Sequence, residues 1–264
     1  QLENRCNFIV SRFWDRCNFD LAQRSPEKFN AAFGDWISIM PHASADTVYS
    51  SVDRLLARFA KKGPVLLDIA NMAENWLYSD TAQYRSDELY LPFARAAATC
   101  KKLSKAERAR YENHVKVIES SSVGANVPDI PFVKADGTKG SMSELGGSSI
   151  LLFFTDPDCM DCSLAKVRLS TDPDTRALIE RGELTIVNIY PGDTDDENWE
   201  RVKDGAPAEW LTVAMPDAYE YFDIRTTPMF VFLNSARKVL ATNLDAEYLI
   251  GAFRVANQAQ KNKK

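Results

Sequence analysis

The feature that most constrains this chain is a run of five apolar residues, 150–154, that leads within five residues to a Cys-x-x-Cys motif. The run has the length and aromatic content of a buried strand, and residues 155–158, Thr-Asp-Pro-Asp, suit a sharp loop after it. Beyond the motif, apolar residues recur at the spacing of a helix with one buried face: Leu164, Val167 and Leu169. The pattern predicts a strand, a loop and a helix, with Cys159 and Cys162 at the start of the helix.

This placement gives the two cysteines a distinct chemistry. Two cysteines separated by two residues at a helix N-terminus lie close enough to form a small, reversible disulfide. The helix dipole and the unpaired backbone N–H groups of the first turn favour the thiolate of Cys159. A thiolate exposed at the end of a strand is the reactive group of thiol–disulfide exchange. We therefore expect redox chemistry at Cys159 and Cys162.

Length and composition limit the classes of protein to which the chain can belong. Its 264 residues suit two domains, and 45% hydrophobic with 26% charged residues is typical of a globular protein with a sizeable core. A net charge of −5 and the absence of a dense basic stripe argue against nucleic acid as a partner. No apolar stretch approaches the roughly 18 residues of a membrane span, so we expect no integral membrane segment.

The chain changes character near residue 122. We interpret residues 1–122 as an all-α helical domain of five or six helices, because capping residues and prolines punctuate apolar positions at helical spacing. The expected helices span about 26–40, 45–62, 64–77, 87–103 and 105–118. Residues 120–124, Ser-Ser-Ser-Val-Gly, are expected to form the linker.

Strand and helix patterns alternate in residues 123–264, which predicts an α/β domain with a mixed sheet. The expected strands are a short hairpin around 131–137, buried strands at 150–154 and 184–190, and a hairpin of 229–233 with 238–241. One expected helix begins at the cysteine motif, and three more cover residues 173–181, 195–203 and 246–258. A helical turn is expected at 143–145.

Three motifs in order resemble the thioredoxin fold of bacterial envelope proteins, the group of TlpA- and ResA-like thiol–disulfide oxidoreductases. The first is Val-Pro-Asp-Ile-Pro-Phe at 127–132 with Asp-Gly at 136–137 and Ser-Glu-Leu at 143–145. The second is the strand, loop and cysteine motif at 150–162, and the third is Thr-Thr-Pro at 226–228. The resemblance covers about residues 127–257. The first half resembles a poorly characterised domain found ahead of such modules, on Phe-Trp-Asp at 13–15 and Phe-Asp at 19–20.

The resemblance implies roles for particular residues. Cys159 corresponds to the attacking thiolate and Cys162 to the resolving thiol. Pro228 corresponds to the cis-proline of the fold, which brings the backbone of Thr227 beside the cysteines to bind an extended substrate segment. The implied activity is the reduction of protein disulfides without a cofactor.

The resemblance also implies a compartment and a partner: the bacterial periplasm or envelope, after secretion across the inner membrane, and a membrane-linked thiol reductant. The first residue is Gln1 rather than methionine, so we expect that an upstream segment has been removed, either a signal peptide or the remainder of a longer expressed chain.

The site departs from the family pattern in ways that affect its chemistry. Asp158 stands where members have an aromatic residue, and Phe153 stands where thioredoxin has a buried acid that serves the resolving cysteine. Any general base must therefore be another residue or water. Asp156, Asp158 and Asp161 place negative charge near the thiols, which disfavours the thiolate and predicts a reducing pair. The alternative is that these aspartates point into water and change the thiol pKa little.

Other uses of the cysteines remain open. A zinc site needs two further ligands, and because His42 and His114 both lie in the first half, we expect no metal site. Cys159 and Cys162 could also form a fixed structural disulfide. The thioredoxin-like domain could instead be a protein- or peptide-binding module with a marginal or vestigial site. Three further cysteines are expected to pack as buried thiols, although the first two could form a bridge: Cys6, Cys17 and Cys100.

Overall fold

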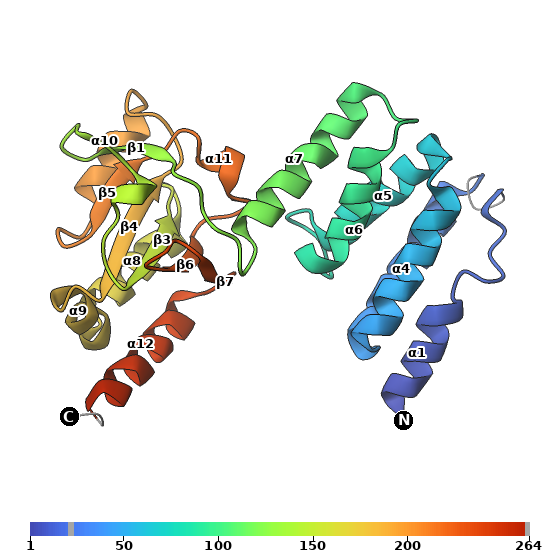
Figure 1. Ribbon diagram of the computed structural model, residues 1–264, viewed down its shortest axis with the longest axis horizontal. Helices are drawn as coiled ribbons and strands as arrows, with labels where there is room; N and C mark the ends of the chain where they lie inside the picture. The colour runs from blue at the N-terminus through green and yellow to red at the C-terminus, as the bar shows by residue number, and fades with distance from the viewer. Residues whose placement is uncertain (21–23, 262–264) are drawn as a thin grey trace. The chain divides into compact units, whose positions relative to one another are not determined.

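The computed structural model describes residues 1–20 and 24–261, and the chain divides into two compact units, Gln1–Val115 and Lys116–Lys264 (Figure 1). Every regular element described in the first unit is helical, and the second unit contains a mixed sheet with helices. This arrangement confirms the predicted fold class, an all-α region followed by an α/β region. The division falls inside one continuous helix, α7 (Lys105–Ser121), so the domain boundary after residue 122 stays a prediction.

The helices of the first unit begin where the sequence supplies capping groups. Its elements are α1 (Leu2–Arg12), α3 (Pro26–Ile39), the 3-10 turn η1 (Met40–His42), α4 (Ala45–Phe59), α5 (Gly63–Leu77), α6 (Asp87–Thr99) and α7. The Ser86 hydroxyl accepts the Leu89 N–H at 3.2 Å at the start of α6. Ser104 and Glu107 exchange two hydrogen bonds, of 2.7 and 3.2 Å, in a capping box before α7. All five expected helices are present, and α1 is an additional one.

Aromatic side chains form much of the core of the first unit. The Trp14 ring packs edge-to-face against Trp36 at 5.5 Å, and Phe33 packs against both Trp36 and Phe93 at 5.5 and 5.8 Å. Trp36, Phe33 and Phe93 are fully buried. Trp14 and Phe19, two residues of the segments 13–15 and 19–20 that carry the weaker resemblance, are therefore part of a packed core.

The expected linker at 120–124 is partly helical, which corrects the sequence analysis. The Ser121 and Ser122 hydroxyls donate to the carbonyls of Val117 and Ile118, at 2.6 and 2.5 Å. These side chains bond to the preceding turn, so α7 continues to Ser121.

Cys6 and Cys100 are buried free thiols and Cys17 is a half-buried one, so no bridge joins Cys6 and Cys17.

The second unit is built on a seven-stranded sheet with the order β2-β1-β5-β4-β3-β6-β7. The strands are β1 (Pro131–Lys134), β2 (Lys139–Ser141), β3 (Ser149–Phe154), β4 (Leu184–Tyr190), β5 (Leu211–Ala214), β6 (Met229–Asn234) and β7 (Val239–Thr242). The central strands β3, β4 and β5 pair in parallel, and the outer pairs are antiparallel. The short strand β5 escaped the sequence analysis because four residues carry little periodicity.

Helices and loops bury both faces of the sheet. Alternate residues of β3 point to opposite sides, so Leu152 and Phe154 join one core and Leu151 and Phe153 the other. The second core is covered by α8 (Met160–Thr171), α9 (Pro173–Glu180) and α12 (Ala246–Lys261). The remaining elements are η2 (Met142–Glu144), α10 (Glu197–Asp204) and α11 (Ala218–Tyr221). The central position of β3, with both faces covered, holds the loop that follows it.

Substitution of Gly34 by alanine is expected to destabilise the first unit by about 1–3 kcal/mol. A Cβ at this buried position of α3 would overlap three ring carbons of Trp76, and the Trp76 indole is fixed by its hydrogen bond to Asn30 at 3.0 Å. Hydrogen exchange in denaturant, read by mass spectrometry, measures the two units separately.

The matched control is Gly251→Ala in α12, where a Cβ meets open space. This change should stabilise the second unit by up to about 1 kcal/mol through helix propensity. Unchanged stability of the first unit in the Gly34→Ala variant would contradict the packing argument.

Candidate functional site

The site forms where the central strand β3 passes into α8. The Asp156 carboxylate accepts the Asp158 N–H at 2.9 Å, which folds residues 155–158 into a tight turn. Cys159 has extended backbone angles, φ −84° and ψ 107°, and occupies the N-cap position of α8. Its sulfur takes the place that a serine or aspartate oxygen usually has at a helix start. The turn and the cap together fix the first cysteine at the tip of the helix.

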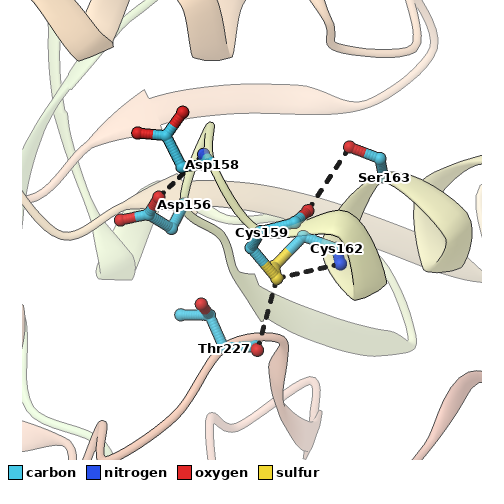
Figure 2. Close-up of a disulfide and its surroundings, with 6 residues drawn as sticks. All are labelled: Asp156, Asp158, Cys159, Cys162, Ser163 and Thr227. Carbon is cyan, nitrogen blue, oxygen red and sulfur yellow. Dashed lines mark hydrogen bonds between the residues drawn. A yellow bond between two sulfur atoms is a disulfide. The ribbon is translucent and has the colours of Figure 1, made fainter.

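Cys159 and Cys162 form a disulfide with a Cα–Cα distance of 5.2 Å (Figure 2). Cys159 is half-buried, whereas Cys162 is fully buried in the core beneath α8. The two sulfurs therefore differ in access: a partner can reach the first, and the protein shields the second.

The start of α8 directs a hydrogen-bond donor at the accessible sulfur. The Cys162 N–H points to Cys159 Sγ at 3.0 Å. A reduced Cys159 in this position gains the N–H bond and the positive end of the helix dipole, and both stabilise its thiolate.

The residues Thr227 and Pro228 lie on a loop that faces the disulfide, as Figure 2 shows for Thr227. The peptide bond between them is cis, and the Thr227 carbonyl oxygen lies 3.3 Å from Cys159 Sγ. The loop reaches this place because Met229 pairs with Phe154, the last residue of β3. Two segments separated by 68 residues are thus brought together at one edge of the site.

The three acidic residues of the site have different surroundings. Asp158 accepts a hydrogen bond from Arg201 of α10 at 2.6 Å, and this bond and the guanidinium charge lower the pKa of the Asp158 carboxyl. Asp156 holds the turn, and Asp161 is exposed in the first turn of α8. In Figure 2 the carboxylates of Asp156 and Asp158 point away from the disulfide. Arg201, which the sequence analysis missed, therefore offsets one of the three negative charges.

Phe153 occupies the core below the cysteines. It is fully buried, stacks on Phe230 at 5.0 Å and meets the edge of Trp210 at 5.8 Å. Measured over whole residues, Lys166 of α8 is the one charged residue that is buried among those the structure describes. The Asp223 side chain is 8% exposed as well, but it forms an ion pair with Arg225 at 2.9 Å. Lys166 was not predicted as a site residue, although its spacing four residues after Cys162 puts both on one face of the helix.

Replacing Arg201 by glutamine is expected to slow the alkylation of reduced Cys159 near neutral pH. The Asp158 charge is then uncompensated, and a carboxylate near a thiol disfavours the thiolate. Because both partners are exposed, the effect should be roughly two- to fivefold. Asp158→Asn should have the opposite effect, and the double variant should return close to the parent. Mass spectrometry of the peptide that contains Cys159 measures the rate; equal rates in all four proteins would contradict the argument.

Among residues 1–20 and 24–261, no helix has the length and hydropathy that crossing a bilayer requires.

Comparisons with known proteins give matches for both parts of the chain. Residues 1–121 match a domain of unknown function, DUF5106, and residues 141–245 match the thioredoxin-like domain. No curated protein matches the sequence.

A solved thioredoxin-like protein from Bacteroides caccae is similar over 97% of this chain and 94% of its own, with 23% identity and a TM-score of 0.77. A conserved protein of unknown function from Bacteroides fragilis shares 28% identity over 50% of this chain and 98% of its own, with a TM-score of 0.47. The thioredoxin domain of a thiol-disulfide oxidoreductase from Bacteroides vulgatus shares 20% identity over 50% of this chain and 96% of its own, with a TM-score of 0.44.

The first of these structures extends over both units and shows the same fold at low identity. The chain therefore has a helical region that matches the DUF5106 model, followed by an α/β domain with the thioredoxin-like fold.

Proposed function

We propose that this protein is a thiol–disulfide oxidoreductase that reduces disulfide bonds in protein substrates. The observation that carries the proposal is the difference between the two sulfurs: Cys159 is accessible and receives the Cys162 N–H at 3.0 Å, and Cys162 is buried within bonding distance of it. One cysteine has the surroundings of a nucleophile and the other those of a resolving thiol.

The reaction begins from the dithiol form. The Cys159 thiolate attacks one sulfur of the substrate disulfide, and the other substrate sulfur leaves as a thiolate that takes up a proton. Cys162 then loses its proton and attacks Cys159 Sγ, and the bond between Cys159 and the substrate breaks. The substrate gains two electrons and is released as a dithiol, and the enzyme is left with the Cys159–Cys162 disulfide. The Cys159–Cys162 disulfide seen in the structure corresponds to this oxidised form.

The loop of Thr227 and Pro228 is the proposed binding edge for the substrate. The Thr227 carbonyl lies beside the reactive sulfur, 3.3 Å away, where it can accept a backbone N–H from an extended segment. Pairing of this kind binds a substrate through its main chain and selects only weakly among substrates with different side chains. It suits a reductase that acts on several proteins.

A return to the dithiol form requires a thiol reductant. We place the protein in the bacterial periplasm or envelope and assign this role to a membrane-linked thiol protein. The support is the resemblance of residues 127–257 to envelope proteins of the thioredoxin fold, and an oxidising compartment gives such a reductase a steady supply of disulfides.

Insulin reduction tests the activity. The parent protein should reduce insulin disulfides in the presence of dithiothreitol, and Cys159→Ser should fall to the rate of dithiothreitol alone, because the attacking sulfur is lost. Cys162→Ser should accumulate a mixed disulfide with its substrate, visible on a non-reducing gel. Equal activity in the parent and in Cys159→Ser would indicate a binding module instead.

The reduction potential tests the reducing direction. We expect a value nearer to that of thioredoxin, about −270 mV, than to that of the oxidant DsbA, about −120 mV. The negative charge of Asp156, Asp158 and Asp161, of which Arg201 offsets one, disfavours the thiolate and hence the dithiol form. Equilibration with glutathione measures the potential, and the triple asparagine variant should be more oxidising than the parent. A parent value close to that of DsbA would rule out this assignment.

A further inference from the structure

Lys166 is an unusual residue for the interior of a domain. The residue is 9% exposed and has no ion pair among the residues that the structure describes, whereas the similarly buried Asp223 side chain pairs with Arg225 at 2.9 Å. No carboxylate of the described residues lies within salt-bridge distance of its amine; the group that faces Nζ is the Phe153 ring, with the centroid 6.0 Å away. Buried lysines usually have a paired anion. The absence of one favours the neutral amine, and burial lowers the pKa of Lys166.

The position of Lys166 on α8 relates it to the resolving cysteine. Cys162 and Lys166 are four residues apart and share one face of the helix. Helical side chains lean toward the N-terminus, so the lysine stem lies over the turn that carries Cys162. Phe153, whose ring faces the amine, belongs to the same core cluster as Cys162. The thiol and the amine therefore both border the layer between α8 and the sheet.

A second polar group, with an unused hydrogen-bond acceptor, lies on the same side of the sheet. Asn188 of β4 is fully buried and pairs in register with Phe153, so both side chains point to the α8 side. Its amide donates to Thr212 Oγ1 at 3.3 Å, and its Oδ1 has no partner. The Asn188 amide oxygen can therefore accept a further hydrogen bond on this side of the sheet.

Lys166 also borders a route to solvent. It lines an open cavity of about 530 Å³ whose charged walls come from three other segments. These walls carry Arg176 of α9, Asp204 of α10 and Glu209 before β5. The two carboxylates and the guanidinium face the same cavity, so a proton held by Lys166 can pass to water there.

We propose that Lys166 is the proton acceptor for Cys162 in the resolving step, an inference that rests on the proposed function. The Cys162 S–H bond breaks and its proton goes to the Lys166 amine. The new thiolate forms a bond to Cys159 Sγ, and the bond between Cys159 and the substrate sulfur breaks. The substrate thiolate takes a proton from solvent, and the Lys166 ammonium returns its own proton to water through the cavity. Lys166 thus supplies the base that Phe153 cannot.

A single-turnover reaction with 5,5′-dithiobis(2-nitrobenzoate) tests the proposal, because each cysteine releases one coloured thiolate. Attack by Cys159 releases the first and resolution by Cys162 the second. Lys166→Met should slow the second phase by roughly 100-fold at neutral pH and leave the first unchanged. Its pH profile should move to higher pH, because Cys162 must then lose its proton to water. Signals from the remaining cysteines are subtracted with the Cys159→Ser/Cys162→Ser double variant.

Two further variants separate proton acceptance from other roles. Lys166→Arg places a permanent positive charge at this position and cannot accept a proton at these pH values, so its second phase should be as slow as that of Lys166→Met. Arg168→Met removes an exposed cation of the same helix, paired with Glu247 at 2.7 Å, and should leave both phases unchanged. Thermal melts of each variant verify folding.

The outcomes are distinct. A second phase that is unaffected in Lys166→Met, or a fast second phase in Lys166→Arg, would overturn the role of Lys166 and leave the proposed function in place. Loss of the first phase in the parent protein would instead overturn the proposed function.

Discussion

The contact between the Cys162 N–H and Cys159 Sγ, 3.0 Å long, is the interaction on which the site depends. It exists only because β3 ends at the centre of the sheet and the turn at Asp156 directs the chain into α8. The same strand pairs with β6, which sets the Thr227 carbonyl 3.3 Å from that sulfur. A helix start and a distant loop thus meet at one atom, and the rigidity of a sheet covered on both faces keeps them there.

The two sulfurs are controlled by different parts of the protein. Cys159 lies at the surface, where backbone dipoles and the exposed Asp158–Arg201 pair act on it. Cys162 lies in an apolar core, where a thiolate is costly without a nearby proton acceptor or positive charge. With Phe153 stacked on Phe230, the sheet offers no acid to this core. Lys166 lies on the helix side instead, and for this reason we propose a base on α8 and not one on the sheet for the resolving step.

Local sequence patterns were enough to predict the strand at 150–154 and the helix after the cysteines. They also predicted helices before residue 122 and a mixture of strands and helices after it. Each of these predictions depends on residue spacing within a short window. Arg201 could not be predicted, since it meets Asp158 across 43 residues only after α10 packs beside the loop. Lys166 left a readable signal: a lysine four residues after Cys162, on a face whose other members are buried. The helix extension through Ser121 was missed because serines usually indicate a loop, and here their hydroxyls bond to the preceding turn.

Screening by dissolved salt affects the surroundings of Cys159 and those of Cys162 differently. Asp158 and Arg201 are 73% and 52% exposed, so added salt weakens their influence on Cys159, because the Debye length falls to about 10 Å at 0.1 M. Lys166 is 9% exposed, and the proton transfer proposed between it and Cys162 takes place below α8, where screening by salt is weaker than at the surface. Ionic strength is therefore expected to change the proposed first attack on a substrate more than the proposed resolving step. In the proposed reductase, the interior of the domain would then set the rate of substrate release more than the charge at its surface does.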